Sequence, residues 1–541
     1  MKAGAGRAVL SAASGLRAGT PAETIGAQNQ RATLAAAQAA GAHAFVAELP
    51  EGYDTPVGDG GIILAASQRL RLAVARLFAA DPPAIVLEDP TAGLDALGEA
   101  AALPGLEALL RGREITVVGA SPAVRAAVVR ATGGARPARR HASRLPKDPC
   151  LPSLTRLLDA HEMAPLLGAM LEGGESDVRV HSVRYKPGDN VVVQYGVLTP
   201  SGWGTAVAYS RAGSGLERKR KRAPNRKLVR RAADRTPALE PFAYFPEVSA
   251  LVQWLPLDVR LPILCDSAER LAGRLAKKGI VATDLDEIEL LRYWPRRRAV
   301  LRFGAHILKV YRDGSDFDEA RRALRASKML KHVRTAAYVG ALKARQVTVQ
   351  EWLPGRGPSL WPASSEAAGR VVADLHRDIP LSVPTMTPRR ILAKAAVRGE
   401  FIGHLVPGLR SDVATLMGDL AAMAPQEMPA VTSHGNFHAG QLLAGPSGLA
   451  LIDLDRMCQA APAYDLATFA AHVAFGRPGE MDVVGAATDS LVAGYGSRPL
   501  GLNWYLATCL LRRAAVPFRF QDEHWPEAVA ELVRHAREAL R

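Results

Sequence analysis

The chain has 541 residues, 48% of them apolar, and a mean hydropathy of zero, which is typical of a globular protein with about two to four domains. Its formal charge is +15 at pH 7, but much of it is local, so the excess alone does not indicate a nucleic-acid-binding protein. The sequence shows no bilayer-spanning apolar run, no signal-peptide pattern and no clustered cysteines, so we expect a cytoplasmic protein without membrane insertion, zinc or disulfides.

The first motifs lie between His43 and Asp95. They are F-V-A-E-L-P-E-G-Y-D-T-P-V-G-D-G-G, then L-A-A-S-Q-R-L-R-L-A-V-A-R, then A-I-V-L-E-D-P-T-A-G-L-D. Their order and spacing resemble the back half of an ABC-type ATP-binding domain. The resemblance implies a signature helix after Leu64, whose N-terminal amides meet a phosphate, and a buried strand at Ile85 to Leu87. We therefore expect residues 1–145 to be a partial α/β module of this kind.

This module departs from the family where the chemistry lies. Ala65-Ala66-Ser67 replaces the glycines that let backbone approach phosphate, Glu88-Asp89 inverts the acidic pair, and Ser121 stands where the switch histidine belongs. The chain contains no G-x-x-x-x-G-K-[ST] sequence to cradle phosphates. We predict that the module does not hydrolyse ATP. It is either a remnant kept for packing or docking, or a surface that pairs with the ATP-binding subunit of an ABC transporter.

A strongly basic segment follows the basic linker of residues 135–147. It reads R-K-R-K-R from Arg218 to Arg222 and continues with basic residues to Arg231, with no aromatic side chain to stack on a base. A solvated loop and a contact to an anionic partner are both open interpretations, whereas nucleic-acid binding is disfavoured.

The middle of the chain contains an internal repeat. The phrase V-R-Y-K-P-G-D-N-V-V-V-Q-Y begins at Val183, and L-R-Y-W-P-R-R-R-A-V-L-R-F begins at Leu291, 108 residues later (291 − 183). Each is a strand, a proline-centred reversal and a second strand. We infer two related antiparallel β units, the first being a cap or duplicated lobe at 146–275 and the second belonging to a domain at 276–360.

The second β unit leads into residues typical of a nucleotide site. Lys309 lies in an apolar strand, from which an ammonium can reach phosphates as the third-strand lysine of kinases does. Glu319, in a helix that we expect to be capped near Asp316 or Asp318, is the candidate partner of Lys309. The strand that ends at Glu351, Trp352 and Leu353 is interpreted either as an adenine-binding hinge or as an ordinary strand end.

The most informative motif is S-H-G-N-F-H-A-G-Q-L-L from Ser433, followed by A-L-I-D-L-D-R from Ala450. An amide-bearing loop before a strand that ends in carboxylates is what a phosphoryl-transfer site needs to hold magnesium and to aim a hydroxyl. However, Asn436 stands where a catalytic carboxylate is expected, and an amide cannot accept a proton.

From about residue 148 onward the chain resembles the aminoglycoside phosphotransferase-like kinases, which phosphorylate hydroxyls of small molecules. The Ser433 run resembles their H-G-D-x-H-x-x-N loop, and I-D-L-D resembles their metal strand. The resemblance implies a bilobal protein-kinase-like fold with its C-lobe at 361–541, and ATP and Mg²⁺ as cofactors. It also implies site roles for Asn436 and His434 in the loop, for Asp455 beside them, and for Asp453 and Gln441 as metal ligands.

Two hypotheses follow. In the first, the chain is a slow small-molecule kinase in which Asp455 or His438 partly replaces the missing base. In the second, it is a pseudokinase that binds nucleotide and serves as a scaffold or sensor, with ABC transporter subunits as candidate partners. Trp504, Tyr505 and Trp525 are interpreted either as aromatic surface for the acceptor or as core residues.

Overall fold

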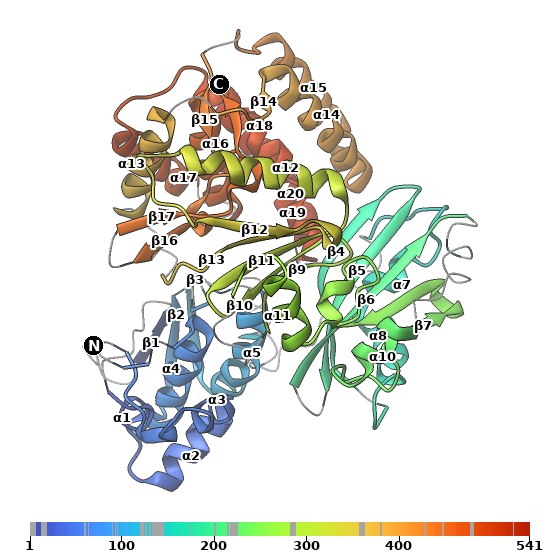
Figure 1. The fold of residues 1–541 in the computed structure, drawn as a ribbon, viewed down its shortest axis with the longest axis vertical. Helices are drawn as coiled ribbons and strands as arrows, with labels where there is room; N and C mark the ends of the chain where they lie inside the picture. Colours follow the sequence, from blue (N-terminus) through green and yellow to red (C-terminus); the bar gives the residue numbers. More distant parts are fainter. Residues whose placement is uncertain are drawn as a thin grey trace. The chain divides into compact units, whose positions relative to one another are not determined.

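A computed structural model of the chain forms two compact units, Met1–His141 and Ala142–Arg541 (Figure 1). The residues that the structure describes are 7–11, 19–58, 61–62, 64–88, 90–91, 94, 96–119, 124, 127–128, 131, 145–174, 176–199, 202–213, 216, 226–281, 288–355, 363–378, 381–426, 429–445, 448–476, 481–522 and 524–541.

The first unit is a small α/β module. Its parallel sheet has the order β1-β2-β3, formed by β1 (Arg7–Ser11), β2 (Ala84–Glu88) and β3 (Glu114–Gly119). Its helices are α1 (Pro21–Ile25), α2 (Gln30–Ala39), α3 (His43–Ala47), α4 (Ala66–Ala80) and α5 (Ala96–Leu110). Ile85 and Leu87 of β2 are fully buried, as the apolar run predicts. Asp89 and Ser121 lie outside the described residues.

The expected signature helix is α4, which begins at Ala66. Its N-cap, Ala65, offers no side-chain cap, and the side chain of Gln68 instead accepts a hydrogen bond from the N–H of Ala65 at 2.8 Å. This contact occupies one of the first free N–H groups near the helix start. The side chain of Gln68 thus occupies one of the N–H groups that a ligand could otherwise contact at the N-terminal end of α4.

The second unit opens with a five-stranded antiparallel sheet. Its strands are β4 (Val178–Lys186), β5 (Asn190–Thr199), β6 (Gly202–Arg211), β7 (Phe242–Phe245) and β8 (Ala250–Trp254), in the order β4-β5-β6-β8-β7. The helices α7 (Leu154–Leu158) and α8 (Ala160–Gly168) precede it, and α10 (Arg226–Ala233) connects β6 to β7. The solvated loop expected at the basic segment is therefore wrong from Arg226 onward, where a helix exposes Arg226, Lys227 and Arg230. Arg218 to Arg222 lie outside the described residues.

A second five-stranded antiparallel sheet follows α11 (Ala268–Ala276). Its strands are β9 (Ile288–Trp294), β10 (Arg298–Phe303), β11 (His306–Tyr311), β12 (Tyr338–Leu342) and β13 (Val347–Glu351), with α12 (Gly314–Ala326) between β11 and β12. Its order, β9-β10-β11-β13-β12, is the order of the first sheet, and each sheet has its helix after the third strand. Helix α12 is capped by Asp313, whose side chain accepts a hydrogen bond from the N–H of Asp316, so Asp316 lies near the cap as expected.

Strand register confirms the internal repeat. In the first sheet Arg184 pairs with Val192, which pairs with Tyr209; in the second, Arg292 pairs with Val300, which pairs with Lys309. The residues of the first two strands in these rows differ by the same 108 positions (292 − 184 and 300 − 192). The two sheets therefore share strand order and register in these rows, and Tyr209 takes the place that Lys309 has in the second.

The remainder of the unit is mainly helical. Its helices are α13 (Ala363–Arg377), α14 (Pro388–Leu405), α15 (Arg410–Ala422), α16 (Ala463–Gly476), α17 (Met481–Tyr495), α18 (Leu502–Arg513), α19 (Val516–Arg519) and α20 (Trp525–Leu540). Its short strands are β14 (Thr385–Met386), β15 (Val431–Ser433), β16 (Leu442–Gly445), β17 (Gly448–Leu451) and β18 (Cys458–Ala460). None of the helices that the structure describes is long and apolar enough to cross a membrane.

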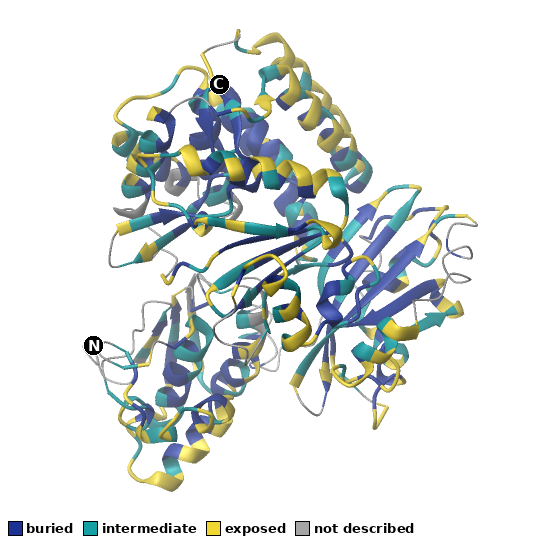
Figure 2. Cartoon of the chain, viewed as in Figure 1, coloured by how far each residue is buried: buried dark blue, intermediate teal, exposed yellow. Residues whose placement is uncertain are grey.

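Burial settles the role of three aromatic residues in the helical region. Trp504, Tyr505 and Trp525 retain only 3%, 1% and 2% of their surface. Figure 2 shows the buried interior of the helical region in dark blue. The indole N–H of Trp504 donates to the carbonyl of Leu420 at 2.8 Å, which satisfies its polar group inside the core. These residues stabilise the helical region and offer no aromatic surface to an acceptor.

Candidate active site

Lys309 projects from β11 into a buried cluster of opposite charges. The ammonium lies 2.6 Å from Oδ1 of Asp453 and 2.8 Å from Oδ1 of Asp455, and the lysine is only 5% exposed. A buried ammonium is costly unless it is paired and hydrogen-bonded, and here two carboxylates pair with it. The β sheet and the loop between β17 and η8 (Leu454–Arg456) therefore contribute to one site.

Arg298 is a second cation in this cluster, which the sequence analysis missed. Its guanidinium lies 3.0 Å from Asp453 and 3.2 Å from Asp455, and it also packs over the ring of Trp294. Arg298 is the first residue of β10, directly after the Pro-Arg-Arg turn. The sequence signal was a run of three arginines, but nothing in the pattern shows which of the three turns toward the carboxylates.

The two aspartates differ in their surroundings. Asp455 is nearly buried and also accepts a 2.6 Å hydrogen bond from the hydroxyl of Tyr311. Asp453 has a left-handed backbone, with φ of 60°, which a residue other than glycine adopts only when its surroundings impose it. Burial alone would raise the pKa of Asp453, but Lys309 and Arg298 outweigh it and hold that pKa well below its usual range. Asp453 is thus ionised and aimed at the cations.

The loop that carries His434 is held by a buried carboxylate. Asp465, at the start of α16, accepts hydrogen bonds from the N–H groups of His434 at 2.7 Å and Gly435 at 2.9 Å. Gly435 has φ of 79°, and a Cβ there would lie 2.2 Å from the carbonyl oxygen of Arg456, so only glycine fits. Nε2 of His434 lies 2.9 Å from the carbonyl of Ile452, which ties the loop to the residue before Asp453.

Removing the charge of Asp465 should loosen this loop. We expect Asp465→Asn to lower the free energy of unfolding by about 1–3 kcal/mol, because an amide leaves one buried N–H without an acceptor. Burial by itself would raise the pKa of Asp465, but His376 and the loop N–H groups lower it below its ordinary 3.8. Its stabilising contribution is therefore present above about pH 4 and is lost as pH falls through the folded-state pKa.

Urea unfolding of both proteins between pH 2 and pH 7 would measure this effect. The exposed Asp419→Asn variant is the matched control, with little expected change. An Asp465→Asn variant as stable as the parent at pH 7 would contradict the role assigned to Asp465.

Asn436 lies beyond His434 on the same loop. It is half-buried, its N–H donates to Nδ1 of His434 at 3.3 Å, and its side-chain amide contacts no hydrogen-bond partner among the described residues. This leaves the amide available to a hydroxyl group but without the ability to remove its proton.

The two suggested substitutes for a base are already engaged. Asp455 is bound by Lys309, Arg298 and Tyr311. His438 stacks on His472 at 4.0 Å, and burial, together with the neighbouring charges, lowers the pKa of His438 to about 2, which makes it a poor base. Neither Asp455 nor His438 is therefore available as a free general base beside Asn436.

Two further predicted groups lie apart from the cluster. Glu319 is exposed on α12, and Lys309 pairs with the two aspartates instead, so the expected Lys309–Glu319 pair is not formed. At the hinge, the N–H groups of Glu351 and Trp352 are used by the carbonyls of Ala337 and Ala305, both at 2.9 Å. The N–H of Leu353 has no acceptor within the part of the chain that the structure describes.

Part of the second unit matches a known family. Residues 290–501 match APH, the phosphotransferase enzyme family. These residues are a phosphotransferase-family domain. The match confirms the resemblance read from the Ser433 run and the I-D-L-D string, over the second β sheet and most of the helical region.

Several solved structures resemble this domain at low identity. An aminoglycoside phosphotransferase from Streptomyces rimosus is 19% identical, with 40% of this chain and 89% of that one covered and a TM-score of 0.30. A macrolide 2'-phosphotransferase from Brachybacterium faecium is 18% identical, covering 50% and 96%, with a TM-score of 0.34. A choline/ethanolamine kinase family protein from Mesorhizobium loti is 12% identical, covering 50% and 94%, with a TM-score of 0.36.

The N-terminal region matches ABC transporter ATP-binding proteins. An ABC transporter B family member from Arabidopsis thaliana is 46% identical over 83 residues, which are 15% of this chain and 7% of that protein. An ATP-dependent lipid A-core flippase from Alkalilimnicola ehrlichii is 44% identical over 84 residues, 16% of this chain and 14% of that protein. The chain thus spans a small fraction of the length of these curated relatives.

The donors in the phosphotransferase domain fit a magnesium ion in their chemistry. Asp453 and Asp455 share one ammonium, so their carboxylates lie close enough to face a common ion, and carboxylate oxygens are preferred ligands of Mg²⁺. The amide nitrogen of Gln441 points at Asp453 at 3.4 Å, so its oxygen would become a ligand only after the amide turns. No cluster of three or more His, Cys, Asp or Glu side chains gathers among the described residues, and phosphate and water would complete the coordination.

Proposed function

We propose that the phosphotransferase domain transfers the γ-phosphate of ATP, slowly, to a hydroxyl group of a small molecule. The supporting observation is the 2.6 Å contact between Lys309 and Asp453, which unites the phosphate-binding ammonium of the β sheet with the metal-binding carboxylate of the helical region. Phosphoryl transfer depends mainly on positioning and on neutralising phosphate charge, and this arrangement provides both.

Each residue of the site has a role in this proposal. Lys309 and Arg298 neutralise the phosphates, and the free N–H of Leu353 donates to the adenine. Asp453 and Asp455, with the amide of Gln441, hold magnesium, which when bound neutralises charge on the transferring phosphate. Asn436 orients the acceptor hydroxyl without removing its proton, while His434 fixes the loop. The absence of a base makes the reaction slow, because a positioned base contributes roughly 10²–10⁴-fold.

Two measurements on the full chain test the proposal. Thermal unfolding with ATP, with and without magnesium, reports nucleotide binding, since a ligand that binds the folded state stabilises it. Release of labelled γ-phosphate to a panel of hydroxylated compounds reports transfer. Stabilisation together with turnover on at least one acceptor is the expected result, and the lack of stabilisation by any nucleotide would reject a nucleotide site altogether.

A pseudokinase is the second candidate, and one observation favours it. Asp455, the carboxylate suggested as a substitute base for Asn436, is held by two cations and a phenol. In this alternative the domain binds nucleotide without turnover, and the Met1–His141 unit docks on an ATP-binding subunit of an ABC transporter. Stabilisation by ATP without transfer to any acceptor, together with co-elution of the chain with such a subunit, would favour this alternative.

Arg298 should compete with magnesium for the two aspartates. We expect Arg298→Gln to lower the magnesium concentration that gives half-maximal ATP-dependent stabilisation, by roughly tenfold, because the carboxylates lose one paired cation. A magnesium titration followed by thermal unfolding would measure this shift. Arg297→Gln removes the same charge from the exposed neighbour in the turn and should change little. Equal shifts in both variants would show a general charge effect instead of competition.

A further inference from the structure

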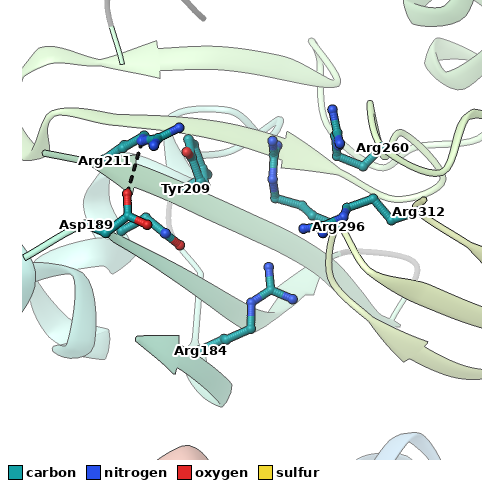
Figure 3. Close-up of a pocket in the computed structure, with 8 residues that line it drawn as sticks. Arg184, Asp189, Tyr209, Arg211, Arg260, Arg296 and Arg312 are labelled. Atoms are coloured by element: carbon teal, nitrogen blue, oxygen red, sulfur yellow. Dashed lines mark ion pairs between the residues drawn. The ribbon is translucent and has the colours of Figure 1, made fainter. Parts of the chain in front are cut away.

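A second, strongly basic pocket lies between the two β sheets of the Ala142–Arg541 unit. Its volume is about 360 Å³, and it is lined mainly by arginines (Figure 3). The charged residues that line it are Arg184, Arg211, Arg260, Arg296, Arg312 and Asp189. Side chains from the first sheet and from the turn and strand ends of the second sheet meet here. It shares no residue with the Lys309 cluster.

Three of the five arginines that line this pocket, Arg184, Arg260 and Arg296, have no ion-pair partner among the described residues, whereas Arg312 pairs with Asp313 at 2.7 Å. Asp189 is already paired with Arg211 at 3.2 Å and with Lys186 at 3.1 Å. The guanidinium of Arg184 has no hydrogen-bond acceptor among the residues that the structure describes, and Figure 3 shows it turned toward the same space as that of Arg296. The three unpaired guanidinium groups repel one another unless an anion lies between them.

Arg296 is held in place so that it faces the pocket. It is 8% exposed and has φ of 59°, its N–H donates to Asp258 at 2.7 Å, and its guanidinium lies 4.3 Å from the ring of Tyr209.

Burial lowers the pKa of Arg184 to about 10, and the neighbouring Arg297 and Arg312 add to this effect. Unpaired, partly buried cations either destabilise the folded protein by repulsion or form a binding site for an anion.

The internal repeat relates the position of this pocket in the first sheet to the position of Lys309 in the second sheet. Tyr209 occupies the sheet position of Lys309, Arg211 that of Tyr311, and Asn190 that of Arg298, since Asn190 pairs with Arg211 as Arg298 pairs with Tyr311. The pocket therefore lies on the face of the duplicated sheet that corresponds to the face carrying the candidate phosphate site. Arg296 and Arg312, contributed by the second sheet, add cations that the duplicate itself lacks.

We propose that this arginine pocket binds a small anion that carries two or more phosphate groups. A guanidinium group can bind two phosphate oxygens at once, and three unpaired arginines exceed what one phosphate group requires. The volume is within the range of small-molecule sites. The charge argument stands alone, whereas the correspondence with Lys309 rests on the proposed function.

Calorimetric titration of the full chain with inorganic pyrophosphate tests this site. Arg184→Gln and Arg260→Gln should each weaken binding at least tenfold, whereas the exposed Arg389→Gln, which removes the same charge from α14, should leave the dissociation constant within twofold. Arg184→Gln should also leave the unliganded protein equally or more stable, because it relieves repulsion. Repeating the titrations with ATP distinguishes a free polyphosphate from a nucleotide as the source of the phosphates.

The outcomes separate this site from the candidate active site. Loss of pyrophosphate binding in the Arg184 and Arg260 variants, with binding retained in Lys309→Met, would support the pocket even if no acceptor is ever phosphorylated. Loss in Lys309→Met alone would place the anion in the active site and overturn the proposal. No binding to the parent protein, or equal weakening by Arg389→Gln, would overturn it too.

Discussion

Asn436→Asp is expected to raise the rate of phosphate transfer by roughly 10²–10⁴-fold, the contribution of a positioned general base. The change replaces one amide nitrogen by an oxygen on a loop whose backbone is already fixed by Asp465 and by the contact of His434 with Ile452. The new carboxylate would occupy the half-buried position of an amide that has no described partner, so it breaks no existing hydrogen bond. Steady-state turnover at saturating ATP and magnesium measures the gain.

The same variant separates the two functional candidates. If the parent transfers phosphate slowly, Asn436→Asp should raise kcat with little change in the KM for ATP, since Asn436 is not assigned to nucleotide binding. If the parent binds ATP without turnover and the variant acquires it, the parent is a pseudokinase. Asn436→Ala is the control, because it also removes the amide but supplies no base. An equal gain in Asn436→Ala, or no gain in Asn436→Asp, would contradict the role of this position.

Much of the fold could be predicted because strand repeats leave a local signal. The phrases that begin at Val183 and Leu291 alternate apolar residues with a period of two and reverse at proline, which predicts a hairpin without knowledge of distant contacts. The identical strand order of the two sheets then follows from similar sequence. The apolar run at Ile85 predicted the buried central strand of the first unit for the same reason.

The ion-pair network could be predicted only in part, because pairing is decided by tertiary contacts. Lys309 and Asp453 were identified from local motifs. However, Glu319 was expected to pair with Lys309, whereas in the structure Asp453 and Asp455 do so. The helical periodicity of α12 leaves open which face Glu319 takes, and the fold exposes it. Arg298 was missed because a run of three arginines does not indicate where each side chain points. In the structure the side chain of Arg296 lies over Tyr209, whereas that of Arg298 pairs with the aspartates.

Lys309→Met is expected to abolish stabilisation by ATP and to lower turnover by at least roughly 10²–10³-fold, the cost of removing one preorganised charged group from a transition state. The variant should still fold. Arg298 pairs with both Asp453 and Asp455, so neither carboxylate is left without a cation when the ammonium is removed. Methionine also retains the apolar stem of lysine among the strand's buried neighbours. Thermal unfolding with and without ATP, beside γ-phosphate transfer, measures both effects.

Glu319→Gln is the decisive companion to Lys309→Met. In the structure Glu319 is exposed and apart from the ammonium, so its neutral variant should bind ATP and turn over as the parent does. If Glu319→Gln instead reproduces the loss seen in Lys309→Met, the helix α12 must carry Glu319 to Lys309 when nucleotide binds, and the aspartates would then be released to magnesium. An active Lys309→Met variant would remove the ammonium from the mechanism, because no phosphate contact would then depend on it.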